Sequence, residues 1–433
     1  MKQAIINAQI YDFETYIPNG YVLFNQTIEQ VGAMADFNDD NYQIIDAKGK
    51  LVMPGLVCGH THIYSTFARG LSVPFNPKNF QDILDQMWWK LDRHLDQEAV
   101  YYSGLVAASS FAMHGVTSII DHHASGKQIR GTLAKLKMAI DEVGLRAAYA
   151  FETSDRFPLQ EAIDENLEFI DTHSDGKTKG LFGLHASLSL SDHSLSKIKA
   201  VIGKRPIHIH VAESELDQQD SLAKYGRRVV KRLDDFGLIN QGSILVHCVH
   251  VNDEELDIIK KRGAVIAVNI TSNMNNAVGL PNILKCIEKG IPVIIGNDGI
   301  ARSMSGEYLM LYFGMHHHYQ SPTKFQLSHL LTLINATYDY AGHLFGVKLG
   351  KIRPGYAADL LLVDYTSATP ISSDNGLAHL FFGLFDALMP QEVYINGTRI
   401  VAAGKLLSDS VIEKTKHAPT IANRVWNDIH AKE

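Results

Sequence analysis

The pattern of hydrophobic and polar positions divides the chain into two kinds of segment. Both ends carry short β-rich runs separated by Gly, Asn and Asp residues that are typical of turns. These runs lie at 4–8, 21–24 and 43–46, and again at 358–364 and 392–395, where Asn396-Gly397 marks a hairpin turn. The long middle part alternates apolar runs with stretches of helical period, so we expect it to fold differently from the ends.

Eight apolar, β-branched runs recur in the middle part. They lie at 51–59, 116–121, 145–151, 180–187, 206–212, 244–250, 264–270 and 292–297. Near-continuous apolar runs are typical of parallel strands that are buried on both faces. Helical periodicity lies between them, for example at 126–143, 159–172, 215–236 and 252–262, with Ser191, Asn252 and Ser305 as expected N-caps.

Eight strands alternating with helices predict an α/β protein with a TIM-type (β/α)₈ barrel. The rival fold, an open doubly wound sheet, requires a Gly-rich phosphate loop after its first strand, and the sequence has none there. The β-rich ends are expected to pair into one small composite β-sandwich. The predicted domains are therefore 1–52 (first part of the sandwich), 53–350 (barrel) and 351–433 (second part of the sandwich and a C-terminal tail).

Composition excludes several classes of protein. With 45% hydrophobic residues and a net charge of −7, the chain is neither disordered nor basic, so we expect no nucleic-acid and no membrane partner. The three cysteines are far apart and predict no disulfide framework. The N-terminus meets an acid before any apolar stretch of signal length, and the uncharged run 263–284 is rich in asparagine. We therefore expect a soluble, cytoplasmic protein.

The 21 histidines carry the strongest chemical signal. His60-Thr61-His62 ends the first predicted barrel strand, where residues i and i+2 point to the same face. Both imidazoles are therefore expected at the C-terminal end of the barrel, where this fold builds its active sites. Imidazole is a usual zinc ligand, so the pair predicts half of a tetrahedral metal site.

The fifth predicted strand offers His208 and His210, which face the same way, so spacing alone does not choose between them. We favour His210 as the ligand because it lies nearer the strand end, with His208 packed one layer below. Glu213 follows at the strand mouth. A carboxylate beside metal-bound water can accept a proton and deliver it to a substrate atom.

The sixth and eighth predicted strands end in His247 and Asp298. His247 is either a fourth imidazole on the metal or a hydrogen-bond partner of the attacking water. We favour the second role because Asp298 completes a set of three histidines and one aspartate, which leaves room for water on a catalytic metal. The candidates all fall at the C-terminal ends of predicted strands, and random core histidines would not be distributed in this way.

These motifs resemble the amidohydrolase superfamily, in the branch of mononuclear deaminases and chlorohydrolases that includes guanine, cytosine, adenosylhomocysteine and triazine enzymes. The resemblance spans the chain and rests on Met53-Pro54-Gly55-Leu56, His60-Thr61-His62, Gly115-Val116-Thr117, His210-Val211-Ala212-Glu213, Val246-His247-Cys248-Val249, Asn297-Asp298-Gly299, Ala336-Thr337 and the segment 350–360. Ala68-Arg69-Gly70, Trp88-Trp89 and Asp121-His122-His123-Ala124 are most similar to the SsnA-type aminohydrolases.

The resemblance implies a set of metal ligands and a set of acid/base residues. The ligands are His60, His62, His210 and Asp298, which would hold Zn²⁺, with Fe²⁺ as the alternative. The catalytic residues are Glu213, His247 and Asp298. Binuclear relatives bridge two metals with a carboxylated lysine on the fourth strand, but here only Lys179 precedes that strand and no lysine lies near its end, so we expect one divalent metal.

Three residues are candidates for substrate binding. His185 stands where related deaminases contact substrate and where guanine deaminases resemble Arg-Phe; the alternative is a structural histidine. Arg69 either pairs with an anionic substrate group or is a surface residue. His122 and His123 point in opposite directions on a strand, so at most one lines the pocket, and we choose His122. Trp88 and Trp89 are expected as packing or pocket wall.

The predicted function is hydrolytic deamination of an amino-substituted nitrogen heterocycle. Metal-activated water attacks the carbon of the C–N bond, with Glu213 as the proton shuttle. A chlorohydrolase or a cyclic amide hydrolase would use the same site, and an inactive metal-binding scaffold is a more remote alternative. The expected partner is a small N-heterocyclic substrate, and a homodimer is expected from the resemblance.

Overall fold

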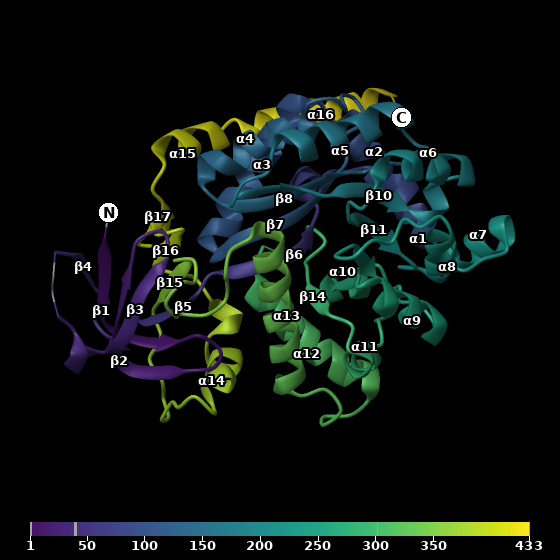
Figure 1. Cartoon of the computed structure of the whole chain (residues 1–433). Helices are drawn as coiled ribbons and strands as arrows, with labels where there is room; N and C mark the ends of the chain where they lie inside the picture. The colour runs from purple at the N-terminus through teal and green to yellow at the C-terminus, as the bar shows by residue number, and fades with distance from the viewer. Residues whose placement is uncertain (1, 39–40, 301, 433) are drawn as a thin grey trace.

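The computed structural model describes residues 2–38, 41–300 and 302–432. A β-barrel surrounded by helices lies at one side of the molecule, and a strongly curved sheet built from both chain ends lies at the other (Figure 1). The predicted α/β fold with a composite terminal β-unit is therefore present, while the residue boundaries given above for the domains stay a prediction.

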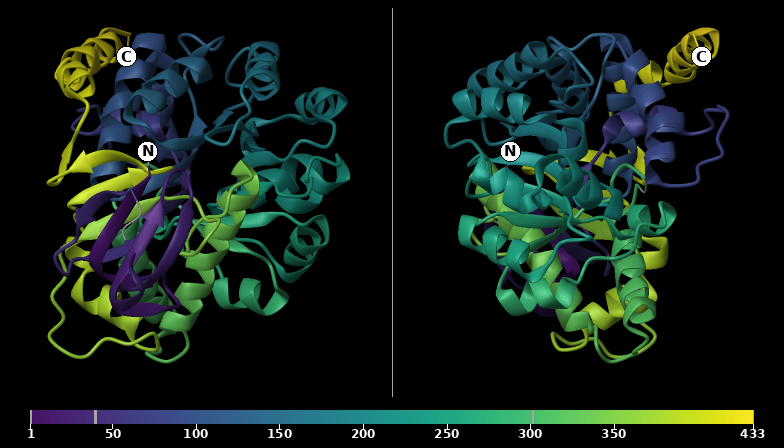
Figure 2. Two further views of the ribbon diagram at one scale, coloured as in Figure 1. Left: turned by 60° about the vertical axis from the view of Figure 1, so that its left-hand side comes forward. Right: turned by 90° about the vertical axis from the view of Figure 1, so that its right-hand side faces the viewer.

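Strands from both ends of the chain form one nine-stranded sheet, in which the N-terminal and C-terminal strands lie side by side (Figure 2). Its strands are β1 (Gln3–Tyr11), β2 (Tyr16–Phe24), β3 (Ile28–Ala33), β4 (Gln43–Asp46), β5 (Leu51–Pro54), β15 (Leu360–Val363), β16 (Glu392–Ile395), β17 (Thr398–Ala402) and β18 (Lys405–Leu406). The antiparallel pair of β5 and β15 joins the two ends. Phe24, Leu360 and Tyr394 pack in their shared core.

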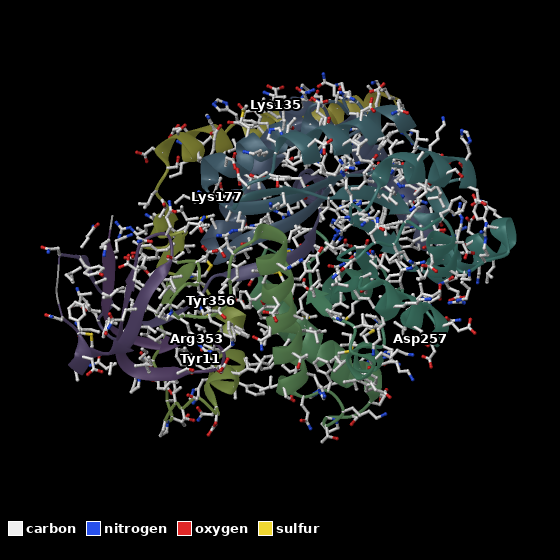
Figure 3. All side chains as sticks on the ribbon, in the orientation of Figure 1. Tyr11, Lys135, Lys177, Asp257, Arg353 and Tyr356 are labelled. Atoms are coloured by element: carbon white, nitrogen blue, oxygen red, sulfur yellow. The ribbon has the colours of Figure 1, made fainter. Side chains whose placement is uncertain are left out.

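Ion pairs add a second link between the two ends. Arg353, which follows the last barrel helix, lies beside Tyr11 in Figure 3. Its guanidinium contacts Glu14 at 2.8 Å and Asp12 at 3.4 Å. The loop that leads back from the barrel is therefore fixed to the N-terminal hairpin by charge as well as by strand pairing.

The barrel strands are parallel and almost entirely buried, as near-continuous apolar runs require. They are β6 (Leu56–Thr61), β7 (Val116–His123), β8 (Arg146–Phe151), β9 (Thr178–Gly180), β10 (Phe182–Ala186), β11 (Ile207–Val211), β12 (Ile244–His247), β13 (Val265–Val268) and β14 (Val293–Ile295). β9 pairs with β8 and β10 pairs with β11, so these two short strands together act as the fourth barrel strand. The amide of Asn297 donates to the carbonyl of His60 at 2.9 Å and closes the barrel between its last and first strands.

The predicted first strand, 51–59, is in fact two strands in two sheets. β5 belongs to the terminal sheet and β6 to the barrel, with the change at Gly55. The Gly55 amide bonds to Asp359 and the next amide bonds to Gly115. A Cβ at Gly55 would meet the Thr117 side chain at 2.2 Å, so only glycine allows the chain to pass from one sheet to the other.

Helices cover the outside of the barrel and the mouth of its C-terminal end. They are α1 (Phe80–Ile83), α2 (Trp89–His94), α3 (Gln97–Met113), α4 (Thr132–Val143), α5 (Leu159–Thr172), α6 (Asp192–Ile202), α7 (Glu215–Tyr225), α8 (Val229–Asp235), α9 (Asp253–Arg262), α10 (Ile270–Asn275), α11 (Ile283–Lys289), α12 (Met304–Tyr319) and α13 (Leu327–Phe345). A π-helical turn, η3 (Leu84–Trp88), joins α1 to α2, and short 3₁₀ turns are η1 (Met34–Asp36), η2 (Ile63–Ala68), η4 (Ser187–Ser189) and η5 (Phe385–Ala387).

Two of the three expected N-caps are confirmed. Ser191 and Asn252 accept bonds from the first turns of α6 and α9. The expectation for Ser305 is wrong: Ser303 caps α12, and the Ser305 hydroxyl inside the helix donates to the carbonyl of Phe385 at 2.7 Å. Two serines at this spacing both suit a cap, and packing against η5 decides between them.

The C-terminal tail folds back onto the barrel as helices. α14 (Gly376–Gly383) follows the sheet strand β15, and α15 (Asp409–Thr415) and α16 (Ala418–Lys432) run along α3 (Figure 1). Trp426 donates to the carbonyl of Phe67 at 2.7 Å, next to the loop that follows the first barrel strand. Among the described residues, no helix combines the length and apolar composition that crossing a bilayer requires.

A buried ion pair connects the barrel to the terminal sheet. Arg146 at the start of β8 is fully buried and pairs with Asp359 just before β15. The same guanidinium donates to Ser118 at 2.9 Å and to the side-chain oxygen of Asn396 at 2.6 Å. Removing one partner of such a pair leaves a charge buried without compensation.

We expect Asp359→Asn to lower the free energy of unfolding by about 3–5 kcal/mol, because Arg146 would keep its charge in a dry site. Urea unfolding followed by circular dichroism measures this change. The control is Glu413→Gln, which breaks the exposed ion pair with Lys416 and is expected to change stability by less than about 0.5 kcal/mol. An unchanged unfolding midpoint for Asp359→Asn would contradict the assignment of this pair as the link.

Candidate active site

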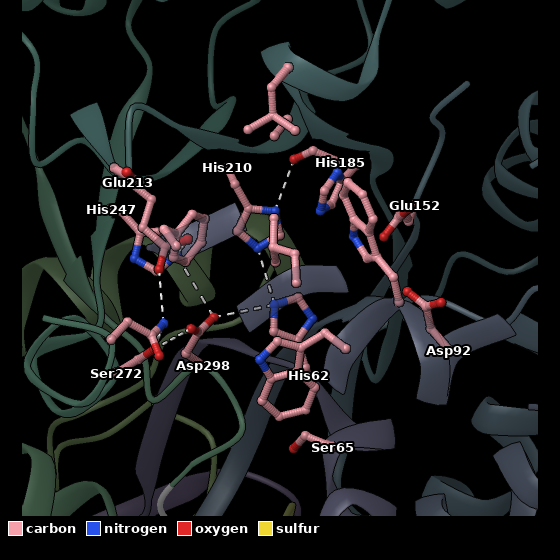
Figure 4. A pocket seen from close by; sticks show the side chains of 18 of the residues that line it. His62, Ser65, Asp92, Glu152, His185, His210, Glu213, His247, Ser272 and Asp298 are labelled. Carbon is pink, nitrogen blue, oxygen red and sulfur yellow. Dashed lines mark hydrogen bonds and ion pairs between the residues drawn. The ribbon is translucent and has the colours of Figure 1, made fainter. Parts of the chain in front are cut away.

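Four ligand atoms from three barrel strand ends lie close together, and Figure 4 shows three of the residues, His62, His210 and Asp298. His60 and His62 come from β6 and its end, His210 from β11, and Asp298 from the loop after β14. The Nε2 atom of His60 lies 2.9 Å from Asp298 Oδ1, and that of His62 lies 3.2 Å from the same oxygen. The Nε2 atoms of His62 and His210 are 3.1 Å apart. The structure thus brings together the four residues that the sequence predicted as metal ligands.

Backbone carbonyls fix which nitrogen of two of these rings carries the proton. The Nδ1 atom of His62 lies 2.6 Å from the carbonyl oxygen of His122, and that of His210 lies 2.9 Å from the carbonyl of His185. A carbonyl only accepts hydrogen bonds, so both Nδ1 atoms are protonated. When both rings are neutral, neither Nε2 atom carries a hydrogen. The lone pairs of the two Nε2 atoms then point at each other.

Two lone pairs at 3.1 Å repel unless a positive charge lies between them. Although burial opposes it, the hydrogen bond to Asp298 raises the pKa of His62. Burial, together with the charges of His62 and His247, lowers the pKa of His60 to about 4, so that ring is neutral at pH 7 and able to ligate. Three imidazole nitrogens and one carboxylate oxygen match the donor set of one divalent ion such as Zn²⁺.

His60 is oriented by a second histidine rather than by a carbonyl. Its Nδ1 atom lies 2.8 Å from Nε2 of His208, which is completely buried one layer below. For Nε2 of His60 to ligate, Nδ1–H must donate to His208. His208 therefore carries its own proton on Nδ1, an atom that has no partner among the described residues. The preference for His210 over His208 as the ligand agrees with this geometry.

Two residues of the site, Asp298 and His247, have a left-handed backbone conformation that residues with a Cβ rarely adopt. Asp298 has φ = 56° and His247, at the end of β12, has φ = 69°. Both lie in the left-handed region, which is strained for residues with a Cβ and is common at functional sites. Gly299 follows with φ = 82°, and a Cβ there would meet the carbonyl oxygen of His62 at 2.6 Å. These conformations turn the Asp298 carboxylate into the barrel mouth.

Asp298 is also held by a hydroxyl. Its second oxygen accepts a hydrogen bond of 2.5 Å from Ser272 on α10. Although burial opposes it, the neighbouring imidazoles of His247, His60 and His62 hold the pKa of Asp298 well below its usual range. The carboxylate is therefore ionised and supplies the negative charge of the centre.

Glu213 and His247 stand next to the ligand cluster. Nε2 of His247 lies 3.3 Å from Glu213 and 3.9 Å from Asp298. Burial, reinforced by the charge of Asp298, raises the pKa of Glu213 well above its usual value, while Asn276 donates to it at 3.1 Å. A carboxyl group with a raised pKa is suited to take up and release a proton near neutral pH.

The cluster opens into a cavity at the barrel mouth. Its apolar walls come from the segment between β6 and α3 and include Phe80, Leu84, Trp88 and Trp89. The two tryptophans thus belong to the pocket wall. His185 also lines the cavity, 5.7 Å from the His210 ring, centroid to centroid.

The two other predicted substrate contacts do not line this cavity. Arg69 is exposed and lines a smaller, separate hollow together with Arg302. The His122 side chain is buried and its Nε2 lies 2.9 Å from the carbonyl of Leu184. His122 acts on the centre through its backbone carbonyl, which orients His62.

The sequence analysis missed the residues of α10 and its C-cap that support the site. Ser272, Asn273 and Asn276 contact Asp298, His247 and Glu213 respectively. The position of these residues could have identified them, because they follow the seventh predicted strand and loops after barrel strands carry function in this fold. The asparagines of this segment were used above only as evidence against a membrane-spanning helix. Asp92, Glu152 and Arg156, which line the cavity, were also missed.

Comparison with known proteins places the chain in a family. The model of the amidohydrolase family matches residues 51–400. The chain belongs to the amidohydrolase family. This confirms the resemblance read from the sequence, and with it a hydrolase that acts on carbon–nitrogen bonds.

Two relatives of this amidohydrolase illustrate the similarity. A 5'-deoxyadenosine deaminase of Methanopyrus kandleri is 27% identical over 400 residues, which cover 90% of this chain and 89% of the relative. A 5-methylthioadenosine/S-adenosylhomocysteine deaminase of Acetivibrio thermocellus is 31% identical over 364 residues, 80% of each chain. Among solved structures, an adenosine deaminase from Xanthomonas campestris with bound zinc superimposes with a TM-score of 0.84 at 21% identity, over 98% of both chains, which confirms the barrel fold.

We expect His208→Ala to weaken metal binding by about 10–100-fold, because His60 loses the acceptor that holds its ring. His208→Gln places an oxygen near the position of Nε2 and should restore most of the affinity. Metal content after dialysis against graded chelator, measured by plasma mass spectrometry, reports the change.

The control for this experiment is His318→Ala, an exposed position on α12. It is expected to leave metal content unchanged. Equal metal affinity of His208→Ala and the parent would show that His60 does not need this support.

Proposed function

We propose that this amidohydrolase hydrolyses the exocyclic C–N bond of an amino-substituted nitrogen heterocycle and releases ammonia. The observation that carries the proposal is the convergence of three imidazole Nε2 atoms and the Asp298 carboxylate at one cavity that also contains Glu213. His60, His62, His210 and Asp298 would hold a single Zn²⁺, with Fe²⁺ as the alternative. The Xanthomonas neighbour contains bound zinc. When bound, the ion supplies Lewis-acid activation of water.

Glu213 moves the proton. Its carboxylate takes a proton from the attacking water and delivers it to a ring nitrogen, which makes the adjacent carbon electrophilic. The second proton of the water, now on the hydroxyl, then passes through Glu213 to the leaving amino group. The ring nitrogen keeps the first proton, the carbon becomes a carbonyl, and ammonia leaves. Its raised pKa, caused by burial and by Asp298, suits both directions of transfer.

His247 donates a hydrogen bond to the developing oxyanion. The amide nitrogen of Asn273 lies 3.1 Å from Nδ1 of His247 and can only donate, so Nδ1 accepts and the ring proton is on Nε2. That Nε2–H donates no hydrogen bond to any described residue, although Glu213 and Asp298 lie nearby. This supports the role of hydrogen-bond donor over that of a fourth metal ligand.

The relatives favour adenine nucleosides as the first substrates to test. Their names give 5'-deoxyadenosine, 5-methylthioadenosine and S-adenosylhomocysteine as substrates. Phe80, Trp88 and Leu84 offer the flat apolar walls that a purine ring requires. Chlorohydrolase and cyclic amide hydrolase reactions would use the same residues, and a homodimer stays a prediction.

We expect Glu213→Gln to lower kcat for ammonia release by about 10²–10⁴-fold, because the amide cannot carry the proton. Ammonia is measured with zinc-loaded protein over purine nucleosides, pyrimidines, pterins and triazines, with chloride release assayed in parallel on chlorinated rings. Metal content should be unchanged, since Glu213 is outside the ligand set.

The matched control is Glu215→Gln, two residues further on and 58% exposed at its side chain. It should keep the parental kcat. Full activity of Glu213→Gln would reject Glu213 as the proton shuttle, and chloride release without ammonia release would replace the deaminase by a chlorohydrolase.

A further inference from the structure

The cavity has a second polar wall that the reaction does not use. Asp92, Glu152 and Arg156 line the cavity on the opposite side of His62 and His210 from Glu213 (Figure 4 labels the two acids). Asp92 comes from α2, while Glu152 and Arg156 follow the third barrel strand, β8. Asp92 is 1% exposed and Glu152 is 3% exposed, so this wall is built into the protein and is not part of its solvated surface.

The two terminal nitrogens of Arg156 are occupied by these two acids, and its Nε is buried without a hydrogen-bond partner among the described residues. Its Nη2 lies 2.8 and 2.7 Å from the two oxygens of Asp92, and its Nη1 lies 2.7 Å from Glu152 Oε1. The guanidinium also stacks over the Trp89 ring at 4.4 Å. Both terminal nitrogens therefore have strong carboxylate partners, and an anion entering the cavity would have to displace one of them.

The wall has no unpaired positive charge. Two carboxylates face one guanidinium, and Arg156 is the sole lysine or arginine among the described residues that line the cavity. Although burial opposes it, the charge of Arg156 lowers the pKa of Glu152, so this acid is ionised, while burial raises the pKa of Asp92 to about 7. The second oxygen of Glu152 has no hydrogen-bond partner in the described part of the chain, so it is free to accept one.

His185 adds a second acceptor on the same side. The hydroxyl of Ser189 donates to the carbonyl of Ala186 at 3.0 Å, which leaves its oxygen to accept from Nδ1–H of His185 at 2.7 Å. Nε2 of His185 is then unprotonated. This nitrogen therefore presents a lone pair on the side of the cavity that His185 lines.

We propose that this wall, formed by Asp92, Glu152, Arg156 and His185, selects substrates whose substituent donates hydrogen bonds and bears no negative charge. Hydroxyl or ammonium groups fit the two free acceptors, whereas a phosphate or carboxylate would meet an uncompensated carboxylate and no available cation. The inference rests on the proposed deaminase function, and it ranks the substrates of that reaction by the charge of their substituent. Compounds with a neutral 5'-substituent, such as 5'-deoxyadenosine, precede those with a carboxylate, such as S-adenosylhomocysteine.

A charge series on one ring tests the proposal with the zinc-loaded, full-length protein. The compounds are 5'-amino-5'-deoxyadenosine, which is cationic at neutral pH, 5'-deoxyadenosine, and adenosine-5'-carboxylate. We expect kcat/KM for the carboxylate to be at least tenfold below that for the neutral compound, with the amine equal to the neutral compound or better. A carboxylate that is turned over as well as the neutral compound overturns the proposal.

The variant Glu152→Gln removes one charge and keeps the shape of the side chain. It should raise the ratio of kcat/KM for the carboxylate over that for 5'-deoxyadenosine by about tenfold, mainly through KM. A merely structural role of Glu152 would lower both values and leave their ratio unchanged, which would overturn the assignment. Glu168→Gln, an exposed acid on α5, is the matched control and should leave the ratio unchanged.

Calorimetric binding to the same zinc-loaded protein separates the two claims. Binding in the expected charge order without ammonia release overturns the proposed function and supports the selective wall. Ammonia release with no charge preference, or with a preference for the carboxylate, overturns the selective wall and supports the proposed function. If none of the three compounds binds and none yields ammonia, both the proposed function and the selective wall are overturned for adenine nucleosides.

Discussion

Two imidazole nitrogens without hydrogens face each other at 3.1 Å, and the centre depends on what holds them there. Each ring of His62 and His210 has already used its proton on a main-chain carbonyl, so neither can relieve the repulsion by donating to the other. Only a positive charge between them makes the arrangement favourable. With the Asp298 carboxylate beside both, the protein provides a place for one cation and directs its lone pairs to it.

The barrel makes this geometry rigid. The carbonyls that orient His62 and His210 belong to the ends of β7 and β10, which neighbour β6 and β11, so ligand and support are held by the same strand pairing. Gly299 lets the last loop pass close to the main chain of His62, and the left-handed backbone of Asp298 turns its side chain inward. The terminal sheet supports the barrel from outside through the buried pair of Arg146 and Asp359.

The residues proposed to catalyse the reaction and those proposed to select the substrate line different sides of one cavity. Glu213 and His247 lie beside the ligand cluster on barrel strands whose motifs are recognisable in the sequence. The recognition side combines α2, the loop after β8 and the end of β10 around a single arginine with two acidic partners. Because this wall is separate from the metal ligands, its charge can differ among amidohydrolases that share the same reaction centre.

The sequence by itself predicted the barrel and the terminal β-unit, and it grouped His60, His62, His210, Asp298 and Glu213 at one end of the barrel, where the structure brings them together. It did so because buried parallel strands have a distinctive apolar pattern and because their C-terminal ends meet at one edge, so residues far apart in the chain can be assigned to one place. The break of 51–59 at Gly55 was hidden, since both halves are equally apolar and only sheet pairing separates them.

The tertiary structure alone decided which atoms act. His208 and His210 share a face, and depth in the barrel separates ligand from support. The proton positions on His62 and His210 follow from backbone carbonyls, which every residue carries and which leave no trace in the sequence. One terminal nitrogen of Arg156 is occupied by Asp92, which lies 64 positions earlier in the chain. No local sequence pattern links these two side chains, because they meet only when the helix and the barrel pack together.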